Sequence, residues 1–417
     1  MFRSVRGMKD LYGIEFEKYD FVVRKSVEVG KKYGYSVINT PILEYTDVFQ
    51  RSLGDETDVV SKEMYTFTDK GGESVTLRPE GTAGVMRAIV CESMAQSIPL
   101  KLMYFGEMFR YDRPQKGRFR QFRQIGFEHI GDKSPYTDAL TIAMAAEILN
   151  NCGIFDFKIC VNTLGDEETR ANYTKAIVKF LSRHEENLSE ESKLRLQKNP
   201  LRILDSKDKG DKDICSMAPI LLDYVSKEAG TYFEKLCAIL EKYGLNYKID
   251  NFLVRGLDYY SHTAFEFKST ATNYKEALGG GGRYDHLLEV FGGPSVSGVG
   301  FAFGAERLMM LLPEDKIPNN TKKVAVIPVS DEETKDAFEL IKLLHKCDIT
   351  TEFVHVGNLS KKMKIAHRLG CDIALIIGET ECKNNTVTVK LMHHTDEEKK
   401  TRSVGMNDLI RFIKYHL

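Results

Sequence analysis

The spacing of apolar residues along the first part of the chain predicts a long helix followed by strands. Apolar positions from Phe16 to Val29 recur at helical intervals, and the pattern ends near Gly34. Residues 100–111 and 120–131 are instead β-type runs joined by a polar loop. Because the two runs are so close in sequence, we expect an antiparallel hairpin with a long tip.

The texture of the chain changes in its middle part. Residues 166–247 are rich in Lys and Glu and follow a helical pattern, with an expected loop at 205–213. Strand character resumes over residues 252–269, and residues 297–312 read as a strand that runs into a helix. We therefore interpret the charged middle part as a helical insertion within a domain that is otherwise built on a sheet.

A second change in texture marks the C-terminal part. Residues 313–321 are rich in Pro and Asn and predict a linker. Beyond them, strand-like and helix-like segments alternate over residues 322–417, which indicates a small α/β domain with a largely parallel sheet. The expected organisation is a core of residues 1–312 that carries the insertion 166–247, then the linker and the C-terminal domain.

The composition argues against several classes of protein but does not identify the function. The chain has 417 residues and a net charge of -1, so a polyanionic partner must be held by local patches of charge. No apolar run approaches the length of a bilayer, and the first residues lack the apolar segment of a secretory signal, so we expect a cytoplasmic protein without membrane contact. The eight cysteines are scattered without a C-x-x-C pair, which favours reduced thiols over a zinc site or disulfides.

The stretch FRYDRPQKGRFRQFRQIGFE, residues 109–128, gathers basic side chains around the predicted loop and ends with an acid. Because side chains alternate along a strand, Gln124 and Glu128 would point into a cleft that Arg110 borders. Phe122 is expected on the opposite face. Several guanidiniums fixed around one cavity suit phosphate, since their forked donors match its oxygens. The alternative is a solvated basic hairpin without a specific ligand.

Two further charged residues, Glu80 and Arg255, lie at unusual places in the predicted secondary structure. Glu80 follows a predicted strand and precedes a helix start at Thr82, where a carboxylate and a hydroxyl can bind an ammonium group. An ordinary helix cap is the alternative. Arg255 lies in an otherwise apolar predicted strand, and a buried arginine is costly unless an anion meets it. The alternative for Arg255 is a structural salt bridge to an acid elsewhere in the chain.

Two glycine-containing segments complete the candidate chemistry. The four consecutive glycines 279–282 leave a backbone without side-chain bulk, which suits close approach of a ligand. They match neither a dinucleotide fingerprint nor a phosphate loop, so on their own they indicate only a tight turn. Arg307 enters the first turn of a predicted helix, and the start of a helix already attracts anions. A surface arginine is the alternative.

The order of these segments resembles class II aminoacyl-tRNA synthetases, and among them the histidyl-tRNA synthetases. The first class motif resembles YSVINTPILEY, residues 35–45, with Pro41 in its expected place. The second motif resembles residues 109–128, and the third resembles GVGFAFGAERL, residues 298–308. Two segments typical of the histidine enzymes match as LVRGLDYY and ALGGGGRYD. The likeness covers essentially the whole chain and is weakest in residues 166–247.

The resemblance implies a fold and an activity. The fold is an α+β catalytic domain built on a mixed, mainly antiparallel sheet, with a helical insertion and a C-terminal α/β anticodon-binding domain. A homodimer formed through the first motif is also implied. The implied activity is the ATP-dependent attachment of L-histidine to tRNA(His), with Mg2+ accompanying ATP and with no zinc or other metal held by the protein alone.

The same resemblance implies roles for individual residues. Arg110 would hold the α-phosphate of ATP, and Arg118 and Arg307 would contact the far phosphates. Arg110 and Arg255 would be catalytic. The implied histidine-binding residues are Glu80, Thr82, Gln124, Glu128, Arg255, Tyr259, Tyr260 and Tyr284. The residues implied at the acceptor end of the tRNA, in the loop of the second motif, are Arg113, Gln115, Lys116 and Arg120.

Two other classes of protein share parts of this pattern. One is a synthetase-like regulatory subunit of a histidine-biosynthesis enzyme, a class that loses ATP-binding arginines and usually the C-terminal domain. This chain keeps Arg110, Arg118, Arg255 and Arg307 together with a full C-terminal domain. The other is a class II synthetase for a different amino acid, against which LVRGLDYY and Glu128 argue. One run, SHTAFEF with His262 at its second position, departs from the commonest pattern.

Overall fold

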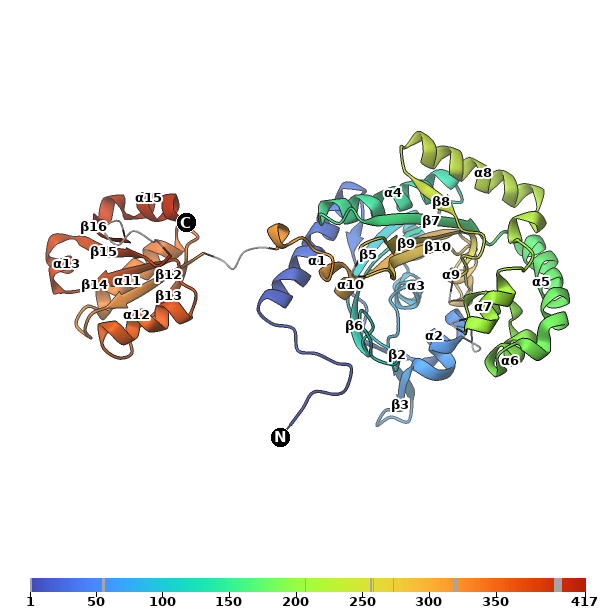
Figure 1. The fold of residues 1–417 in the computed structure, drawn as a ribbon, viewed down its shortest axis with the longest axis horizontal. Helices are drawn as coiled ribbons and strands as arrows, with labels where there is room; N and C mark the ends of the chain where they lie inside the picture. Colours follow the sequence, from blue (N-terminus) through green and yellow to red (C-terminus); the bar gives the residue numbers. More distant parts are fainter. Residues whose placement is uncertain are drawn as a thin grey trace. The chain divides into compact units, whose positions relative to one another are not determined.

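The protein consists of two compact units, Met1–Ile317 and Pro318–Leu417, which are described separately (Figure 1). The computed structural model describes residues 2–54, 57–206, 208–255, 257, 259–272, 274–317, 322–393 and 400–417. Among the helices in these ranges, none combines the length and the apolar character that crossing a lipid bilayer requires.

The first unit is built on an eight-stranded sheet with the predicted hairpin inside it. In spatial order the strands are β1 (Ser36–Val37), β5 (Leu100–Phe109), β6 (Gln121–Ile130), β11 (Gly298–Gly304), β10 (Ala277–Arg283), β9 (Ser261–Ser269), β7 (Phe157–Thr163) and β8 (Tyr247–Ile249). The inner strands pair antiparallel, whereas β1 and β8 pair parallel at the edges. The predicted mixed, mainly antiparallel sheet and its β5–β6 hairpin are therefore confirmed.

Alternation of side chains gives this sheet one apolar face. Phe127 of β6 stacks on Phe301 of β11 with ring centroids 5.0 Å apart, and Phe265 of β9 joins them in the main buried core. The helices that cover this face are α1 (Ile14–Lys32), α4 (Pro135–Asn151), α8 (Lys227–Lys242) and α10 (Ala305–Met309). Residues one position away on the same strands face the other side, toward helices α3 (Thr82–Cys91) and α9 (Leu287–Val290).

After β1, at the edge of the large sheet, the chain enters a separate three-stranded sheet. Its order is β2 (Leu43–Tyr45), β4 (Ser74–Leu77), β3 (Tyr65–Thr68), and both pairings are antiparallel. The nearby helical segments are α2 (Thr46–Leu53), the π-helical turn η1 (Val59–Glu63) and the 3-10 turn η2 (Met94–Ser97). The predicted helix beginning at Thr82 is present directly after β4 as α3.

The insertion leaves the sheet after β7 and returns at β8. Its helical segments before α8 are α5 (Glu167–Leu181), η3 (Ser182–Asn187), α6 (Glu190–Lys198), η4 (Pro200–Asp205), α7 (Lys209–Cys215) and η5 (Leu221–Tyr224). A small apolar core of its own, which includes Tyr173, Ile177 and Leu196, holds these segments together. The loop predicted at 205–213 is partly wrong, because the Asp208 carboxylate caps a helix within it. Lys207 lies outside the described residues.

The second unit is a mixed α/β domain. Its sheet has the order β13 (Thr350–Phe353), β12 (Lys323–Pro328), β14 (Ile373–Ile377), β15 (Thr386–Leu391), β16 (Thr401–Gly405). Its helices are α11 (Thr334–His345), α12 (Leu359–Arg368), α13 (Glu379–Asn384) and α15 (Met406–His416). Strands β13, β12 and β14 are parallel, as expected for alternating strands and helices, but β15 and β16 continue the sheet antiparallel.

The segment predicted as a linker, residues 313–321, divides between two environments. A 3-10 turn, η6 (Glu314–Lys316), occupies its first part, and Ile317 packs against the main core of the first unit. Residues 318–321 lie outside the described residues. The first unit therefore continues past residue 312 to Ile317.

Candidate active site

A cavity of about 720 Å³ opens on the polar face of the large sheet. Strands β5, β6, β10 and β11 contribute to it, together with α3 and the segment before β9. Every residue predicted to bind ATP or histidine lines this cavity: Glu80, Thr82, Arg110, Arg118, Gln124, Glu128, Arg255, Tyr259, Tyr260, Tyr284 and Arg307. The structure thus brings guanidiniums from distant parts of the chain to one place.

Strand alternation on β6 explains how two of these positions reach the cavity. Ile125 and Phe127 enter the apolar core, so Gln124 and Glu128 point to the opposite face. The expectation that Phe122 lies on the other face is wrong, because residues two apart on a strand share a face. Phe122 lines the cavity and its ring lies under the Arg110 guanidinium, 5.4 Å from ring centroid to the guanidinium carbon.

Glu128 is the most deeply buried acid in the cavity, with 1% of its side chain exposed. It accepts hydrogen bonds from Thr82 Oγ1 at 2.7 Å and from the hydroxyl of Tyr284. Burial raises the pKa of Glu128 to about 8, and the charge of Glu80 adds to the shift while the two hydroxyls oppose it. Gly300 leaves room for this carboxylate, since a Cβ there would lie 1.9 Å from Oε2.

Glu80 caps a helix, which is the alternative considered for it from the sequence, and it also lines the cavity. Its carboxylate accepts the backbone N–H groups of Thr82 and Ala83, both at 2.7 Å, and so caps α3. Burial raises the pKa of Glu80, although these backbone N–H groups oppose the shift. The helix-cap interpretation is therefore correct for Glu80, and it leaves a carboxylate at the wall of the cavity.

Arg110 and Arg307 form a positively charged region around backbone carbonyls. Arg110 Nε donates to Pro79 O at 2.8 Å, and Arg307 donates to Gly117 O at 3.2 Å and to Ala277 O at 2.7 Å. Burial lowers the pKa of Arg110, and the charge of Arg307 lowers it further. Two cations that repel each other in a buried place favour an anion between them.

Arg118 lies at the loop side of the same region. Its guanidinium is 3.3 Å from the carboxylate of Asp112, within the loop that joins β5 and β6. Both side chains are partly exposed, so this pair is weak and leaves Arg118 able to turn toward a ligand in the cavity.

Arg255 lies in an irregular segment rather than in the predicted strand, which begins only at Ser261 with β9. Gly256 and Asp258 lie outside the described residues. Arg255 Nη1 is 3.2 Å from Glu266 Oε1, so the salt-bridge alternative is realised. Burial opposes its charge, but Tyr260 and Glu266 raise the pKa of Arg255. Its Nε is buried without a partner among the described residues, which leaves one donor for a ligand.

The glycines 279–282 form the central strand β10, so the tight turn that they suggested is wrong. A Cβ on Gly279 would lie 2.3 Å from Ala302 O, and one on Gly281 would lie 1.9 Å from Gly300 O. On the cavity side, a Cβ on Gly280 would lie 2.8 Å from Nη1 of Arg255. Glycine is needed here because the neighbouring strands and a site arginine approach the backbone closely.

Three tyrosines and one amide form the inner wall of the cavity. The ring of Tyr259 lies 4.5 Å from that of Tyr260 and 5.7 Å from that of Tyr284, measured between centroids. Burial raises the pKa of each of these hydroxyls, so all three are neutral donors. Gln124 Oε1 is buried without a partner among the described residues, which marks an acceptor that a ligand could satisfy.

The residues predicted at the loop tip do not line the cavity. Arg113, Gln115 and Lys116 are exposed in the loop between β5 and β6. Arg120 lies over the ring of Tyr111 at 3.8 Å and donates to Asp112 O at 3.3 Å. The sequence-predicted residues therefore form two groups, one inside the cavity and one on the surface beside it.

Charged residues of the insertion also line the cavity and were missed. Arg170, Arg195 and Arg202 belong to this group. Arg195 is 3.1 Å from the Asp58 carboxylate, and Lys62 is 2.9 Å from that of Glu191, so α6 is tied to the η1 region. The only signal in the sequence was the high charge of the insertion, which does not reveal which charges meet the sheet.

Family models and curated relatives agree with the family that the residues of this cavity resemble. A family model described as histidyl-tRNA synthetase matches residues 7–308, and one described as an anticodon-binding domain matches residues 323–416. A histidine–tRNA ligase from Rhodospirillum rubrum is 43% identical over 412 residues, 99% of each chain. One from Gluconobacter oxydans is 42% identical over 409 residues, 98% of this chain and 97% of the relative.

Solved structures give the same result. The apo histidyl-tRNA synthetase of S. aureus has a TM-score of 0.81 at 34% identity, covering 99% of this chain and 100% of the other. A Bacillus halodurans protein described as an ATP phosphoribosyltransferase regulatory subunit/histidyl-tRNA synthetase shares the fold, with a TM-score of 0.65 at 23% identity over 91% of this chain and 98% of that chain. The chain belongs to the histidyl-tRNA synthetase family.

Proposed function

We propose that the protein is a histidine–tRNA ligase, which activates L-histidine with ATP to histidyl-adenylate and transfers the histidyl group to the 3′ end of tRNA(His). One observation carries the proposal: a single cavity joins the buried acid Glu128 to the guanidiniums of Arg110, Arg255 and Arg307. An imidazole suits the acid, and a triphosphate suits the guanidiniums. Membership of the family supports the same reaction.

The inner end of the cavity binds histidine in this proposal. Glu128 accepts one imidazole N–H, and the hydroxyl of Tyr260 satisfies the other ring nitrogen. The α-ammonium group lies between Glu80, Thr82 and Gln124, where the unpartnered Oε1 of Gln124 supports the assignment. A side chain without two polar ring atoms would leave buried groups unpaired, which discriminates far more strongly than a lost methylene.

The outer end binds ATP in a bent conformation. Arg110 holds the α-phosphate, and Arg118 and Arg307 hold the far phosphates. Arg110 and Arg307 use only part of their donors on backbone carbonyls, so each guanidinium retains N–H groups for phosphate oxygens. Tyr259 and Tyr284 line the amino-acid side of the cavity.

Catalysis in this site consists of positioning and charge neutralisation. The histidine carboxylate is already anionic, so it attacks the α-phosphorus without a general base. A carboxylate oxygen–phosphorus bond forms as the bond between the α-phosphorus and the bridging oxygen breaks, and pyrophosphate leaves. Arg110 and Arg255 stabilise the charge on the nonbridging oxygens of the α-phosphate.

The site suits an ion delivered with the nucleotide. No group of three or more His, Cys, Asp or Glu side chains arranged to hold a metal occurs in the part of the chain that the structure describes. Mg2+ would accompany the nucleotide, and it would supply charge neutralisation as pyrophosphate leaves. The protein contributes the guanidiniums that orient the nucleotide.

Transfer to tRNA uses surfaces outside the cavity. Arg113, Gln115, Lys116 and Arg120 lie in the loop beside the cavity, where they can meet the phosphates of the acceptor end. The second unit binds the anticodon arm, as the family match of residues 323–416 supports.

Deletion of residues 322–417 tests the anticodon role. Pyrophosphate exchange should remain, and the attachment of histidine to tRNA should be strongly reduced. Undiminished attachment of histidine to tRNA would contradict the anticodon role.

We also propose that the protein is cytoplasmic and that it forms a homodimer. Apolar side chains are exposed on and beside β1, β2 and β3, namely Val37, Ile42, Leu43, Tyr45 and Phe67. Val37, Ile42, Leu43 and Tyr45 belong to the first class motif, and Phe67 lies in the same three-stranded sheet as β2. Exposed apolar side chains gathered in one region are typical of a subunit interface.

An ATP–pyrophosphate exchange assay with each of the twenty amino acids tests the reaction. Exchange should depend on histidine alone, because only its ring meets both Glu128 and Tyr260. Exchange with another amino acid would contradict the proposed specificity. A complete lack of exchange would instead favour a regulatory subunit of the kind that shares this fold.

A further inference from the structure

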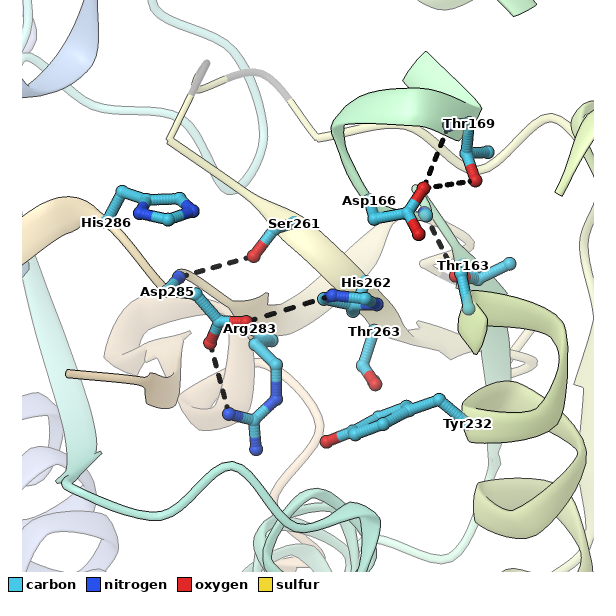
Figure 2. A network of polar contacts seen from close by, with 12 residues as sticks. Thr163, Asp166, Thr169, Tyr232, Ser261, His262, Thr263, Arg283, Asp285 and His286 are labelled. Carbon is cyan, nitrogen blue, oxygen red and sulfur yellow. Dashed lines mark hydrogen bonds and ion pairs between the residues drawn. The ribbon is translucent and has the colours of Figure 1, made fainter. Parts of the chain in front are cut away.

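A buried polar network lies at the end of β10, on the opposite side of the strand from the cavity. Its centre is the ion pair between Arg283 of β10 and Asp138 of α4, two side chains with 0% exposure. Arg283 Nη1 also lies 3.2 Å from Asp285 Oδ1 and 3.0 Å from Asp132 O. Figure 2 shows the Asp285 carboxylate between the Arg283 guanidinium and the ring of His262.

The network reaches two other parts of the first unit. Tyr232 of α8 donates its hydroxyl to Asp138 Oδ2 at 3.0 Å. The Tyr232 ring lies near the Arg283 guanidinium, 5.6 Å from the ring centroid to the guanidinium carbon (Figure 2). The His262 ring lies 5.2 Å from the Tyr232 ring and its Nε2 lies 3.9 Å from Asp285 Oδ2. We refer to Asp138, Tyr232, His262, Thr263, Arg283 and Asp285 as the buried network.

The network is densely connected, because its charged groups pair with one another and with nearby backbone carbonyls. A guanidinium removed from water is costly unless its donors are paired, and here carboxylates and backbone carbonyls take them. Asp138 is held in turn by the hydroxyls of Tyr232 and Thr263. Any movement of Arg283 would break several of these contacts at once.

The position of Tyr284 in the sequence connects this network to the cavity. Tyr284 stands between Arg283 and Asp285, and because side chains alternate, it points to the cavity while its two neighbours point into the network. Its hydroxyl donates to Glu128. Ser261, which follows Tyr260, accepts the backbone N–H of Asp285 at 3.2 Å (Figure 2).

We propose that Arg283 and Asp138 are positioning residues for histidine recognition, which fix Tyr284, and through it Glu128, from behind the sheet. The inference rests on the proposed function, since it assigns a purpose to contacts around the histidine pocket. Neither residue touches the cavity, so their influence passes through the backbone on each side of Tyr284. Tyr232 extends the same support to α8, the helix that returns from the insertion.

Within the described residues, the network adjoins residues of the histidine end of the cavity and not those of the ATP end. Tyr284 and Glu128 belong to the histidine end, whereas the ATP-binding arginines lie in the loop after β5 and on α10. Loosening the network should therefore weaken histidine binding and leave ATP binding unchanged. A purely structural role would instead lower the fraction of active protein without changing either KM.

The test compares Asp138→Asn and Tyr232→Phe with wild type in pyrophosphate exchange, with active sites titrated by adenylate formation. Asp138→Asn should raise the KM for histidine about 10-fold or more, since small misplacements in a site are costly, and change the KM for ATP less than about twofold. Tyr232→Phe, which keeps the ring and the fold, should raise the KM for histidine about threefold.

A matched control is available on the same helix. Tyr33 donates its hydroxyl to Glu147, another carboxylate of α4, at 3.0 Å, and neither residue lines the cavity. Tyr33→Phe should leave both KM values unchanged. Tyr33→Phe therefore reports the effect of losing a tyrosine–carboxylate hydrogen bond outside the network.

A double variant tests the route through Tyr284. In a Tyr284→Phe background, Asp138→Asn should add less than about a twofold change in the KM for histidine, because both changes remove the same interaction. Fully additive effects would overturn the inference. So would an unchanged KM for histidine in Tyr232→Phe, the variant that decides the matter if Asp138→Asn does not fold. A wild type without histidine-dependent exchange would defeat the proposed function instead.

Discussion

Two buried carboxylates of the first unit, Glu128 in the cavity and Asp211 in the insertion, have opposite electrostatic surroundings. Both are hidden from solvent, with 1% and 0% exposure. Burial raises the pKa of Glu128 to about 8. Burial acts the same way on Asp211, but hydroxyls of Ser192 and Ser206 and the N–H of Ser189 outweigh it and lower the pKa of Asp211 to about 2.

The difference lies in the donors that each carboxylate receives. Asp211 accepts the N–H and hydroxyl of Ser189, at 2.9 and 2.7 Å, and the hydroxyls of Ser192 and Ser206, both at 2.6 Å. Glu128 accepts the hydroxyls of Thr82 and Tyr284 and has a second acid, Glu80, nearby. The insertion thus uses a fully satisfied acid to join short helices, whereas the cavity keeps an acid whose charge is incompletely compensated.

The largest expected effect comes from removing the acid of the cavity. Glu128→Gln should lower kcat/KM for histidine in pyrophosphate exchange by about 10³-fold or more, because the amide replaces one acceptor oxygen by an NH2 donor and removes the carboxylate charge that the imidazole N–H meets. The KM for ATP should change little. A variant with near wild-type histidine activation would show that Glu128 is not the imidazole receptor.

Asp211→Asn should leave histidine recognition intact and loosen the insertion. The amide leaves serine hydroxyls without an acceptor, so we expect the local free energy of unfolding to fall by about 3 kcal/mol. Hydrogen exchange of residues 186–215, followed by mass spectrometry, measures the change. Asp213→Asn, an exposed position on the same helix α7, is the matched control and should have no effect. Equal protection in both variants would contradict the role of Asp211.

The sequence alone predicted much of the cavity because strand alternation and turn signals are local. Gln124 and Glu128 share a face as predicted, and the same rule, applied correctly, also places Phe122 there. Arg255 was predicted to need an anion, but Glu266 could not be identified, since the pairing depends on how β9 returns beside the irregular segment. Local periodicity gives the face of a residue and leaves its partner unknown.

Other features depend on contacts that no local pattern encodes. The glycines 279–282 suggested a turn because a strand without side chains has no apolar period, and only the neighbouring strands show why glycine is required. The acceptor Asp211 lies in a segment that was predicted as a loop, and its serine donors are spread from residue 189 to residue 206. The same limit applies to Arg283, whose partner Asp138 lies on a distant helix.

The opposite shifts in pKa predict opposite dependences of stability on pH. For Asp211 the folded pKa is the lower one, so its contribution is complete above the ordinary value and is lost as pH falls toward about 2. This loss should amount to about 2 kcal/mol. For Glu128 the folded pKa is raised, so stability is greatest below its ordinary value and is lost as pH rises through about 8.

Thermal unfolding at several pH values measures both trends. The melting temperature of Glu128→Gln should exceed that of wild type by a margin that grows from about pH 5 to about pH 9, since only wild type must ionise a buried acid. Asp211→Asn should approach wild type in acid, where Asp211 is protonated. Parallel curves for all three proteins would contradict the assigned shifts.

The smallest expected effect tests whether the donors cause the difference between the two acids. Ser192→Ala removes one hydroxyl from Asp211 and should cost about 1 kcal/mol of stability, because the other donors remain. Fewer donors also raise the folded pKa of Asp211, so its loss of stability in acid should begin at a higher pH. Ser26→Ala is the matched control, since Ser26 is equally buried and donates to the backbone carbonyl of Val22 at 2.8 Å. If Ser192→Ala shifts the acid transition no more than Ser26→Ala does, the low pKa of Asp211 has a cause other than its serine donors.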